Sequence, residues 1–456
     1  GSPLLGNFQS APYYPLNFLF LFLPTISAWT VLVMLQPFLA LWFTYLFIRK
    51  LNFHPLAAWF AGISYAFSAY SSVIVEYNTI GHTIAWLPLA LFALEELRTR
   101  LRATWLAVFL FALTSAALAG HPQIFAYVLF SVWIYTFFRI KPLKISSLIS
   151  LFSLLSLGIA AIQYVPGIEL IALAARGSLE TNQLINKLLI QPWQLIGLAF
   201  PNIFGNPATR SYWPTDTFAS KVTSIGLIPL FFLPALWRIR KSFHAKFFLI
   251  AIGVLLVFVT RNPVSSLFAQ LNIPLWSTSN PTLMVFLLSF ALAVGTGIGV
   301  DAWTRENHTK ARLLKRIVSV VIFFILLICS LVIAQRMTPD PWPERLHIAL
   351  RSIIYATGLS LALCLSFALA VLRPKFMQVA LLFLLVVHVA DLWWMFQRFN
   401  PVVPRAFVYP AAPIIDFLKE QKGFNRFWGY GNAAIGPNIA TQLRLYSPDG
   451  YDPLYP

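Results

Sequence analysis

Three short polar clusters interrupt otherwise apolar stretches, and each contains side chains that could do chemistry. The first pairs Glu76 with His82 in "VEYNTIGHTIAWLP". A carboxylate and an imidazole near the ends of adjacent apolar runs suit acid–base or phosphate-binding chemistry. The alternative is a solvated loop in which Glu76 is an ordinary surface charge, and the pattern does not separate the two.

The second cluster is His121-Pro122-Gln123, in the gap of "AALAGHPQIFAYVLF". A proline directly after the histidine disfavours the helical conformation for His121 and suits the first turn of the next helix. The plainer interpretation is a helix start with two polar side chains at the membrane interface. The functional interpretation places His121 and Gln123 at the rim of a binding site.

The third cluster lies in "QYVPGIELIALAARGS" and contains Glu169 and Arg176. These residues are seven apart, so a continuous helix would place them on one face. An arginine there could hold a phosphate with two parallel hydrogen bonds. The alternative is an amphipathic helix lying on the membrane, with Arg176 extending its side chain toward water.

The composition indicates which elements must position these clusters. The 456 residues are 59% hydrophobic and only 11% charged, whereas soluble domains average about 25% charged residues. So little charge cannot cover a soluble surface, and the sequence predicts an all-α multi-pass integral membrane protein. The formal net charge of +18 does not indicate nucleic acid, because the basic residues lie between apolar runs, where they orient a membrane protein.

A membrane-spanning helix needs about 20 mostly apolar residues, and twelve runs approach that requirement. They lie near 28–48, 55–75, 80–97, 103–119, 123–138, 145–166, 222–237, 247–260, 282–300, 317–335, 349–372 and 376–396.

Basic residues concentrate in every second connection between these runs. More than half of the 33 Lys and Arg residues fall in short alternate loops, which face the cytoplasm in membrane proteins. All three polar clusters then face outward, and the cytoplasmic connections are predicted to carry little chemistry. The outward segments are 1–27, 76–81, 120–122, 167–221, 261–281, 336–348 and 397–456.

The chain divides into a membrane domain, 1–396, and the start of a truncated extracytoplasmic α/β domain, 397–456. The second segment is rich in Pro, Gly, Asn and aromatic residues, with one short amphipathic helix near 412–421 followed by strand and turn signals. The chain begins without a methionine and ends in a loop-like stretch, so we expect a fragment truncated at both ends.

Signatures of soluble enzymes and metal sites are missing from the sequence. There is no phosphate-binding glycine loop followed by lysine and no His-Glu-x-x-His. Cys329 and Cys364 lie inside apolar runs and form no metal-binding spacing. "GTGIG", residues 295–299, predicts close helix packing rather than nucleotide binding.

An ordered set of stretches resembles the YfhO-type family of bacterial membrane proteins, which is similar to the GT-C superfamily of glycosyltransferases. The stretches are "GSPLLGNFQSAPYYPLNFLF", "AGHPQIFAYVL", "IQYVPGIELIALAARGS", "LAFPNIFG" and "GYDPL". The resemblance implies a GT-C-like fold and transfer of a sugar from a polyprenyl-phosphate carrier on the outer face of the bacterial cytoplasmic membrane. The implied acceptor is a cell-envelope glycan or a teichoic-acid-like polymer.

The resemblance also implies roles for the clusters. His82, His121, Gln123 and Arg176, beside Glu169, would bind the substrate, while Glu76 would be a second acidic residue that positions the acceptor or a divalent metal ion. Two features depart from the resemblance. The essential Asp of the superfamily, in the first outer loop, is expected before Gly1, together with the first helix. The arginine-rich stretch of the YfhO-type family, before the helix at 282–300, is replaced here by "STSNPTLM", residues 277–284.

A non-catalytic lipid or glycan transporter, either a flippase or an envelope-assembly partner, is the rival function. A transporter should carry ionisable residues deep in its membrane helices. The deep positions of the apolar runs are nearly free of charge, and Asp391, near the outer end of its run, is the closest exception. Polar groups collect instead at the outer ends of the runs, which favours surface chemistry.

Overall fold

The structure is a computed structural model that describes most of the chain. The described residues are 4–173, 184–271, 280–306, 342–409, 412–421, 423, 425–431, 435–436 and 439–448, together with Leu314, Val318, Val320 and Phe324.

Helices account for nearly all regular structure in the described part of the chain, where no strand occurs beyond an isolated bridge between Ile190 and Thr260. The helices of the amino-terminal half are α1 (Leu19–Phe22), α2 (Thr25–Lys50), α3 (Pro55–Ala66), α4 (Ala69–Ile74), α5 (Ile80–Thr99), α6 (Ala103–Leu118), α7 (Pro122–Arg139) and α8 (Leu143–Leu173). Those of the carboxyl-terminal half are α10 (Leu227–Leu230), α11 (Pro234–Arg238), α12 (Phe243–Val259), α13 (Pro263–Gln270), α14 (Val285–Thr304), α16 (Trp342–Leu372), α17 (Met377–Phe399), α18 (Pro413–Gln421) and α19 (Ile439–Gln442).

Six helical segments are long and apolar enough to cross a membrane, which confirms an all-α membrane class. They are Thr25–Lys50, Ile80–Thr99, Leu143–Leu173, Pro281–Thr304, Glu344–Leu372 and Pro374–Phe399. The number rises to eight if each of two bent helix pairs is one span. Twelve spans therefore stay a prediction, and the run at 317–335 lies largely outside the described residues.

Two predicted runs differ from continuous helices for local reasons. The run at 55–75 bends by 41° between α3 and α4. In the run at 222–237, Gly226 adopts a left-handed conformation with φ +92° and helix α10 begins only after it. Pro234 then starts the separate helix α11, and the following α12 turns by 120°. Proline and glycine thus break a stretch whose composition alone is continuous.

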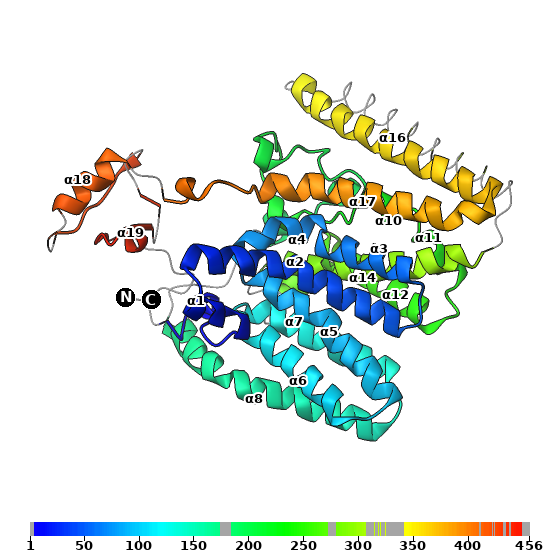
Figure 1. Cartoon of the computed structure of the whole chain (residues 1–456), viewed down its shortest axis with the longest axis horizontal. Coiled ribbons are helices and arrows are strands. Elements are labelled where there is room, and N and C mark those ends of the chain that lie inside the picture. Colours follow the sequence, from blue (N-terminus) through cyan, green and yellow to red (C-terminus); the bar gives the residue numbers. More distant parts are fainter. Residues whose placement is uncertain are drawn as a thin grey trace.

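The basic connections gather at one end of the helix bundle, which we call the basic end. Lys50 at the end of α2 pairs with Glu96 of α5 at 2.7 Å, and Arg139 at the end of α7 pairs with Glu95 at 2.6 Å. Arg238 pairs with Glu306 in the connection after α14. The opposite end, which we call the loop end, carries the longer described segments together with α18 and α19 (Figure 1). The basic connections, which alternate along the sequence with longer segments, therefore lie together at one end of the bundle.

Helix α14 lies at the centre of the molecule and depends on its glycines. A Cβ at Gly299 would lie 2.3 Å from the backbone oxygen of Phe232, and one at Gly297 would lie 3.0 Å from the oxygen of Ala57. Only glycine permits such close backbone approach. The packing role predicted for "GTGIG" is confirmed.

The carboxyl-terminal segment continues from α17 at the loop end (Figure 1). Helix α18 coincides with the amphipathic helix predicted near 412–421. The described residues beyond it form α19 and turns, without the strands that the sequence signals indicated. The α/β domain therefore stays a prediction.

Candidate functional site

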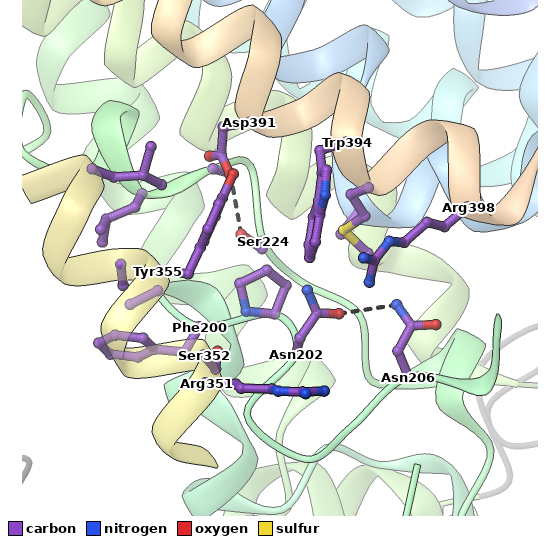
Figure 2. Close-up of a pocket in the computed structure, with 18 of the residues that line it drawn as sticks. Phe200, Asn202, Asn206, Ser224, Arg351, Ser352, Tyr355, Asp391, Trp394 and Arg398 are labelled. Carbon is purple, nitrogen blue, oxygen red and sulfur yellow. Dashed lines mark hydrogen bonds between the residues drawn. The ribbon is translucent and has the colours of Figure 1, made fainter. Parts of the chain in front are cut away.

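A cavity of about 290 Å³ lies in the loop-end half of the molecule, between α16, α17 and two connecting segments. We call it the loop-end cavity. Figure 2 shows Arg351, Ser352 and Tyr355 reaching it from α16, and Asp391, Trp394 and Arg398 from α17. Segments 199–211 and 224–227 complete its wall.

Helical spacing explains how α17 presents three functional side chains together. Asp391, Trp394 and Arg398 are three and four residues apart, so they share one face of the helix. The guanidinium of Arg398 lies 3.5 Å from the centre of the Trp394 ring. The other face of that ring stacks with Tyr355 of α16, at 5.2 Å between ring centres and 16° between planes. The aromatic stack holds one arginine at the rim and joins the two helices.

The carboxylate of Asp391 lies deeper than the arginines. Tyr355 donates its hydroxyl hydrogen to Asp391 Oδ1 at 3.0 Å. Behind the carboxylate, a Cβ on Gly226 would lie 3.3 Å from Asp391 Oδ2, so the backbone of segment 224–227 touches the acid directly. Oδ2 thus lies against this backbone segment, in which the Leu227 N–H also donates a hydrogen bond to the carboxylate.

The loop wall is a tight turn built from amide groups. Asn206 donates from Nδ2 to Asn202 Oδ1 at 2.9 Å, and its own Oδ1 accepts from the Ala208 N–H at 2.9 Å. Gly205 has φ +82°, and a Cβ there would lie 1.9 Å from the Ser211 oxygen, so glycine is required. The turn fixes two amides at the cavity, as Figure 2 shows.

This combination defines the chemistry that the cavity can support. Arginine binds phosphate oxygens with two parallel hydrogen bonds, and two arginines, Arg351 and Arg398, line the wall. A carboxylate below them can accept a proton from a hydroxyl group. Amide side chains supply the donors and acceptors that a polyhydroxylated ligand needs.

The predicted site residue His82 occupies a closed polar network instead. Its Nδ1 lies 2.9 Å from the Tyr14 hydroxyl, which also accepts from Trp86 Nε1 at 3.1 Å. Its Nε2 lies 3.1 Å from Asn78 Oδ1. His82 is fully buried, and Tyr14 of the amino-terminal segment closes the network.

Glu76 lies near this network but points away from it. It is exposed in the 3-10 turn Val75–Tyr77, just before Asn78 with φ +56°. No group of three or more potential metal-ligating side chains occurs among the residues that the structure describes.

His121 and Gln123 form the start of α7, as the proline predicted. His121 Nδ1 accepts from the Ile124 N–H at 3.4 Å, which confirms the helix-start interpretation. Gln123 donates from Nε2 to the Tyr127 hydroxyl at 2.9 Å and to the Asn280 oxygen at 3.0 Å. The "STSNPTLM" stretch, as far as it is described, thus anchors α7.

The amino-terminal segment connects the clusters without making them one cavity. A Cβ at Gly120, beside His121, would lie 2.8 Å from the Phe8 oxygen and 3.3 Å from Thr79. Gln163 of α8 donates to the same Phe8 oxygen at 3.2 Å. His82 and His121 therefore flank residues 8–14, but neither lines the loop-end cavity.

The third cluster is only partly described. Glu169 is exposed on α8, one turn from its end at Leu173. Arg176 lies outside the described residues, so its position relative to Glu169 stays a prediction.

Sequence reasoning missed Arg351, Arg398 and His388, and treated Asp391 only as an exception. The available signals were the spacing of Asp391, Trp394 and Arg398, and the stretch "LAFPNIFG", which supplies Phe200, Asn202 and Gly205 to the cavity wall.

At the basic end, sequence reasoning also missed a buried cluster. Glu95 is 1% exposed and binds Arg98, Arg139 and Tyr135 at 2.6–2.8 Å, which joins α5 to α7.

No family model, curated protein or solved structure matches the chain.

Proposed function

We propose that the protein is a membrane glycosyltransferase that moves a sugar from a polyprenyl-phosphate carrier to a cell-envelope glycan or teichoic-acid-like acceptor. The observation that carries the proposal is the loop-end cavity, in which a carboxylate lies beneath two guanidinium groups between two apolar helices. A lipid carrier reaches such a site from the bilayer, while its phosphate and sugar occupy the polar interior.

Different residues of the cavity have different roles in the proposed reaction. Arg351 and Arg398 bind the phosphate and stabilise the charge that develops when its bond to the sugar breaks. Asp391, held by Tyr355, takes the proton from the acceptor hydroxyl as that oxygen attacks the anomeric carbon from the opposite side. Asn202 and Asn206 bind sugar hydroxyls. The product then has inverted configuration.

The proposal includes an orientation and a second group of residues. The basic end faces the cytoplasm, and the loop end, with residues 397–456, lies outside the bacterial cytoplasmic membrane. Twelve spans are proposed for the chain. We also propose that Glu76, His121, Glu169 and Arg176 help to bind the acceptor.

The test is transfer of a radiolabelled sugar by the full chain in proteoliposomes containing polyprenyl-phosphate-sugar donors and envelope acceptors. Asp391→Asn and Arg398→Gln should each lower turnover by about 10²–10³. Asp416→Asn, on the exposed face of α18, is the matched control and should retain activity. Full turnover in Asp391→Asn at normal abundance would exclude this carboxylate as the base.

A specific observation also favours a transporter as the second candidate. His388 and Asp391 are ionisable residues within the apolar helix α17, and His388 is fully buried. Intramembrane ionisable residues often mark transport pathways. Movement of the intact labelled lipid between leaflets, without cleavage of the phosphate–sugar bond, would identify a transporter and overturn the transferase proposal.

A further inference from the structure

A second cavity, of about 470 Å³, opens at the basic end and takes no part in the function proposed above. We call it the basic-end cavity. Its wall is formed by the ends of α2 and α14, the connection from α2 to α3, and the first turns of α17. Three candidate membrane spans therefore reach it at their ends. The volume lies in the range of about 300–1,000 Å³ that is usual for binding sites of small molecules.

Two guanidinium groups converge on the connection from α2 to α3. Arg49, in the last turn of α2, donates from Nη1 to the backbone oxygen of Phe53. Arg305, directly after α14, donates from Nη2 to the backbone oxygen of Asn52 at 3.4 Å. Asn52 has φ +63°, a left-handed conformation that asparagine adopts more readily than most residues. Because the two acceptors belong to consecutive residues, both positive charges lie at one wall of the cavity.

The acid in the cavity wall is already engaged. Asp301 is 4% exposed, its Oδ2 lies 2.8 Å from Arg305 Nε, and its Oδ1 accepts from the His54 N–H at 2.8 Å. Among the described residues that line the cavity, Asp301 is the one carboxylate, against two arginines. The contacts given above use Nη1 of Arg49 and both Nε and Nη2 of Arg305. Since a guanidinium carries five N–H donors, both arginines keep donors for an anion.

An apolar surface lies beside these charges. Phe53 and Met377 line the cavity and pack, partly buried, against the core cluster that contains Leu381. The cavity lies at the level where the spans end, and the phosphates of phospholipids lie at that level, outside the hydrocarbon core of about 30 Å. Free phosphate would use the guanidinium groups alone, whereas a lipid also uses the apolar surface. Basic pockets between membrane helices on the cytoplasmic side bind anionic headgroups in other proteins.

We propose that the basic-end cavity binds an anionic glycerophospholipid, such as phosphatidylglycerol, from the membrane leaflet at that end. Arg49 and Arg305 bind the phosphate, which matches a guanidinium in geometry and charge. Phe53 and Met377 contact the glycerol and the first carbons of an acyl chain. The cation of a zwitterionic headgroup gains no such partner, because Asp301 is already bound within the wall. The lipid thereby joins the ends of α2, α14 and α17, and this role does not depend on the reaction at the loop-end cavity.

Photo-crosslinking of the purified full chain tests the site directly. The probe is phosphatidylglycerol with a diazirine on the first carbons of one acyl chain, added to protein in an uncharged detergent. After irradiation, mass spectrometry of peptides should locate the label in residues 49–56 and 374–381. Unlabelled phosphatidylglycerol should displace the probe at a concentration about tenfold lower than phosphatidylcholine does. Equal displacement by the two lipids, or label only on other helices, would overturn the proposal.

Soluble competitors separate a lipid site from a phosphate site. Inorganic phosphate and glycerol 1-phosphate carry the anion without acyl chains. Neither should displace the probe at concentrations at which phosphatidylglycerol displaces it completely. Displacement by either of them at those concentrations would show a site for free phosphate and reject the lipid.

Charge variants test the named residues. Arg49→Gln removes one guanidinium and should raise the probe concentration that gives half-maximal labelling by about five- to tenfold. Arg102 is an exposed arginine in the connection from α5 to α6. Arg102→Gln therefore removes the same charge outside the cavity and should leave labelling unchanged.

Gln378→Glu covers the case in which Arg49→Gln fails to fold. Gln378 lines the cavity and is exposed at the start of α17, where a carboxylate suits the helix dipole. This variant should fold, while its charge repels the phosphate and weakens labelling by about fivefold. Gln397→Glu, exposed near the other end of the same helix, is the matched control and should label like the wild type. Unchanged labelling in folded Arg49→Gln or in Gln378→Glu would refute the site.

Discussion

At the scale of single residues, Lys221 shows how burial and pairing compete. Its Nζ binds the Leu189 oxygen and lies 3.6 Å from Asp216 Oδ2. Asp216 also accepts from Gln194 at 2.7 Å and from the Tyr212 hydroxyl at 2.6 Å. Burial lowers the pKa of Lys221 from 10.5 to about 8, although the Asp216 charge opposes the shift. The loop that forms the cavity wall is therefore held by an amine that is costly to charge.

This shift predicts a pH dependence with a definite sign. Between about pH 8 and the unfolded value of 10.5, the unfolded chain binds more protons at Lys221 than the folded chain, so the free energy of unfolding should rise with pH. Cleavage of loop 190–226 by an added protease should therefore slow from about pH 8 to about pH 9.5, after correction for protease activity on an unfolded peptide. Lys221→Met lacks the titrating group and should lose this trend. Equal pH dependence in both proteins would contradict the assignment to Lys221.

At the scale of elements, the close packing of α14 makes a stability prediction. A Cβ at Gly299 would lie 2.3 Å from a backbone oxygen of Phe232, and backbone cannot move aside as a side-chain tip can. Gly299→Ala should therefore lower the free energy of unfolding by about 1–3 kcal/mol, as overpacking does. Gly358→Ala on α16, where a Cβ meets nothing within 4 Å, is the matched control and should be neutral or stabilising. Thermal unfolding in detergent measures both, and equal melting temperatures would refute the tight contact.

The elements also show what apolar composition can predict. It correctly located α2, α5, α8, α14, α16 and α17, because a membrane span must satisfy its backbone within a long helix. It could not anticipate that Gly226 and Pro234 divide one run, since both residues are also tolerated inside membrane helices. Conversely, Pro37 and Pro88 lie inside α2 and α5 without ending them.

At the scale of the whole molecule, the site depends on contacts between residues that lie far apart in the sequence. Asn202, Arg351 and Asp391 meet at one cavity, although long stretches of chain separate them. The clusters singled out from sequence are each local, and two of them proved to be a helix start and a closed network around His82. Local patterns therefore located polar residues at the loop end, while the packing of α16 and α17 decided which of them share a cavity.

The basic end and the loop end lie at opposite ends of the bundle, and this arrangement predicts how the protein is oriented in the membrane. Basic loops stay in the cytoplasm, so the basic end should face inward and the loop-end cavity outward. Three exposed positions test this in a chain with Cys329 and Cys364 replaced by serine: Ala208 at the loop end, and Lys241 and Lys375 at the basic end. In intact cells, a membrane-impermeant thiol reagent should label Ala208→Cys alone. Lys241→Cys and Lys375→Cys should react only after the membrane is opened, which also shows that these thiols are reactive. If Ala208→Cys and Lys241→Cys are labelled from the same side, the opposed ends of the bundle do not correspond to the two faces of the membrane.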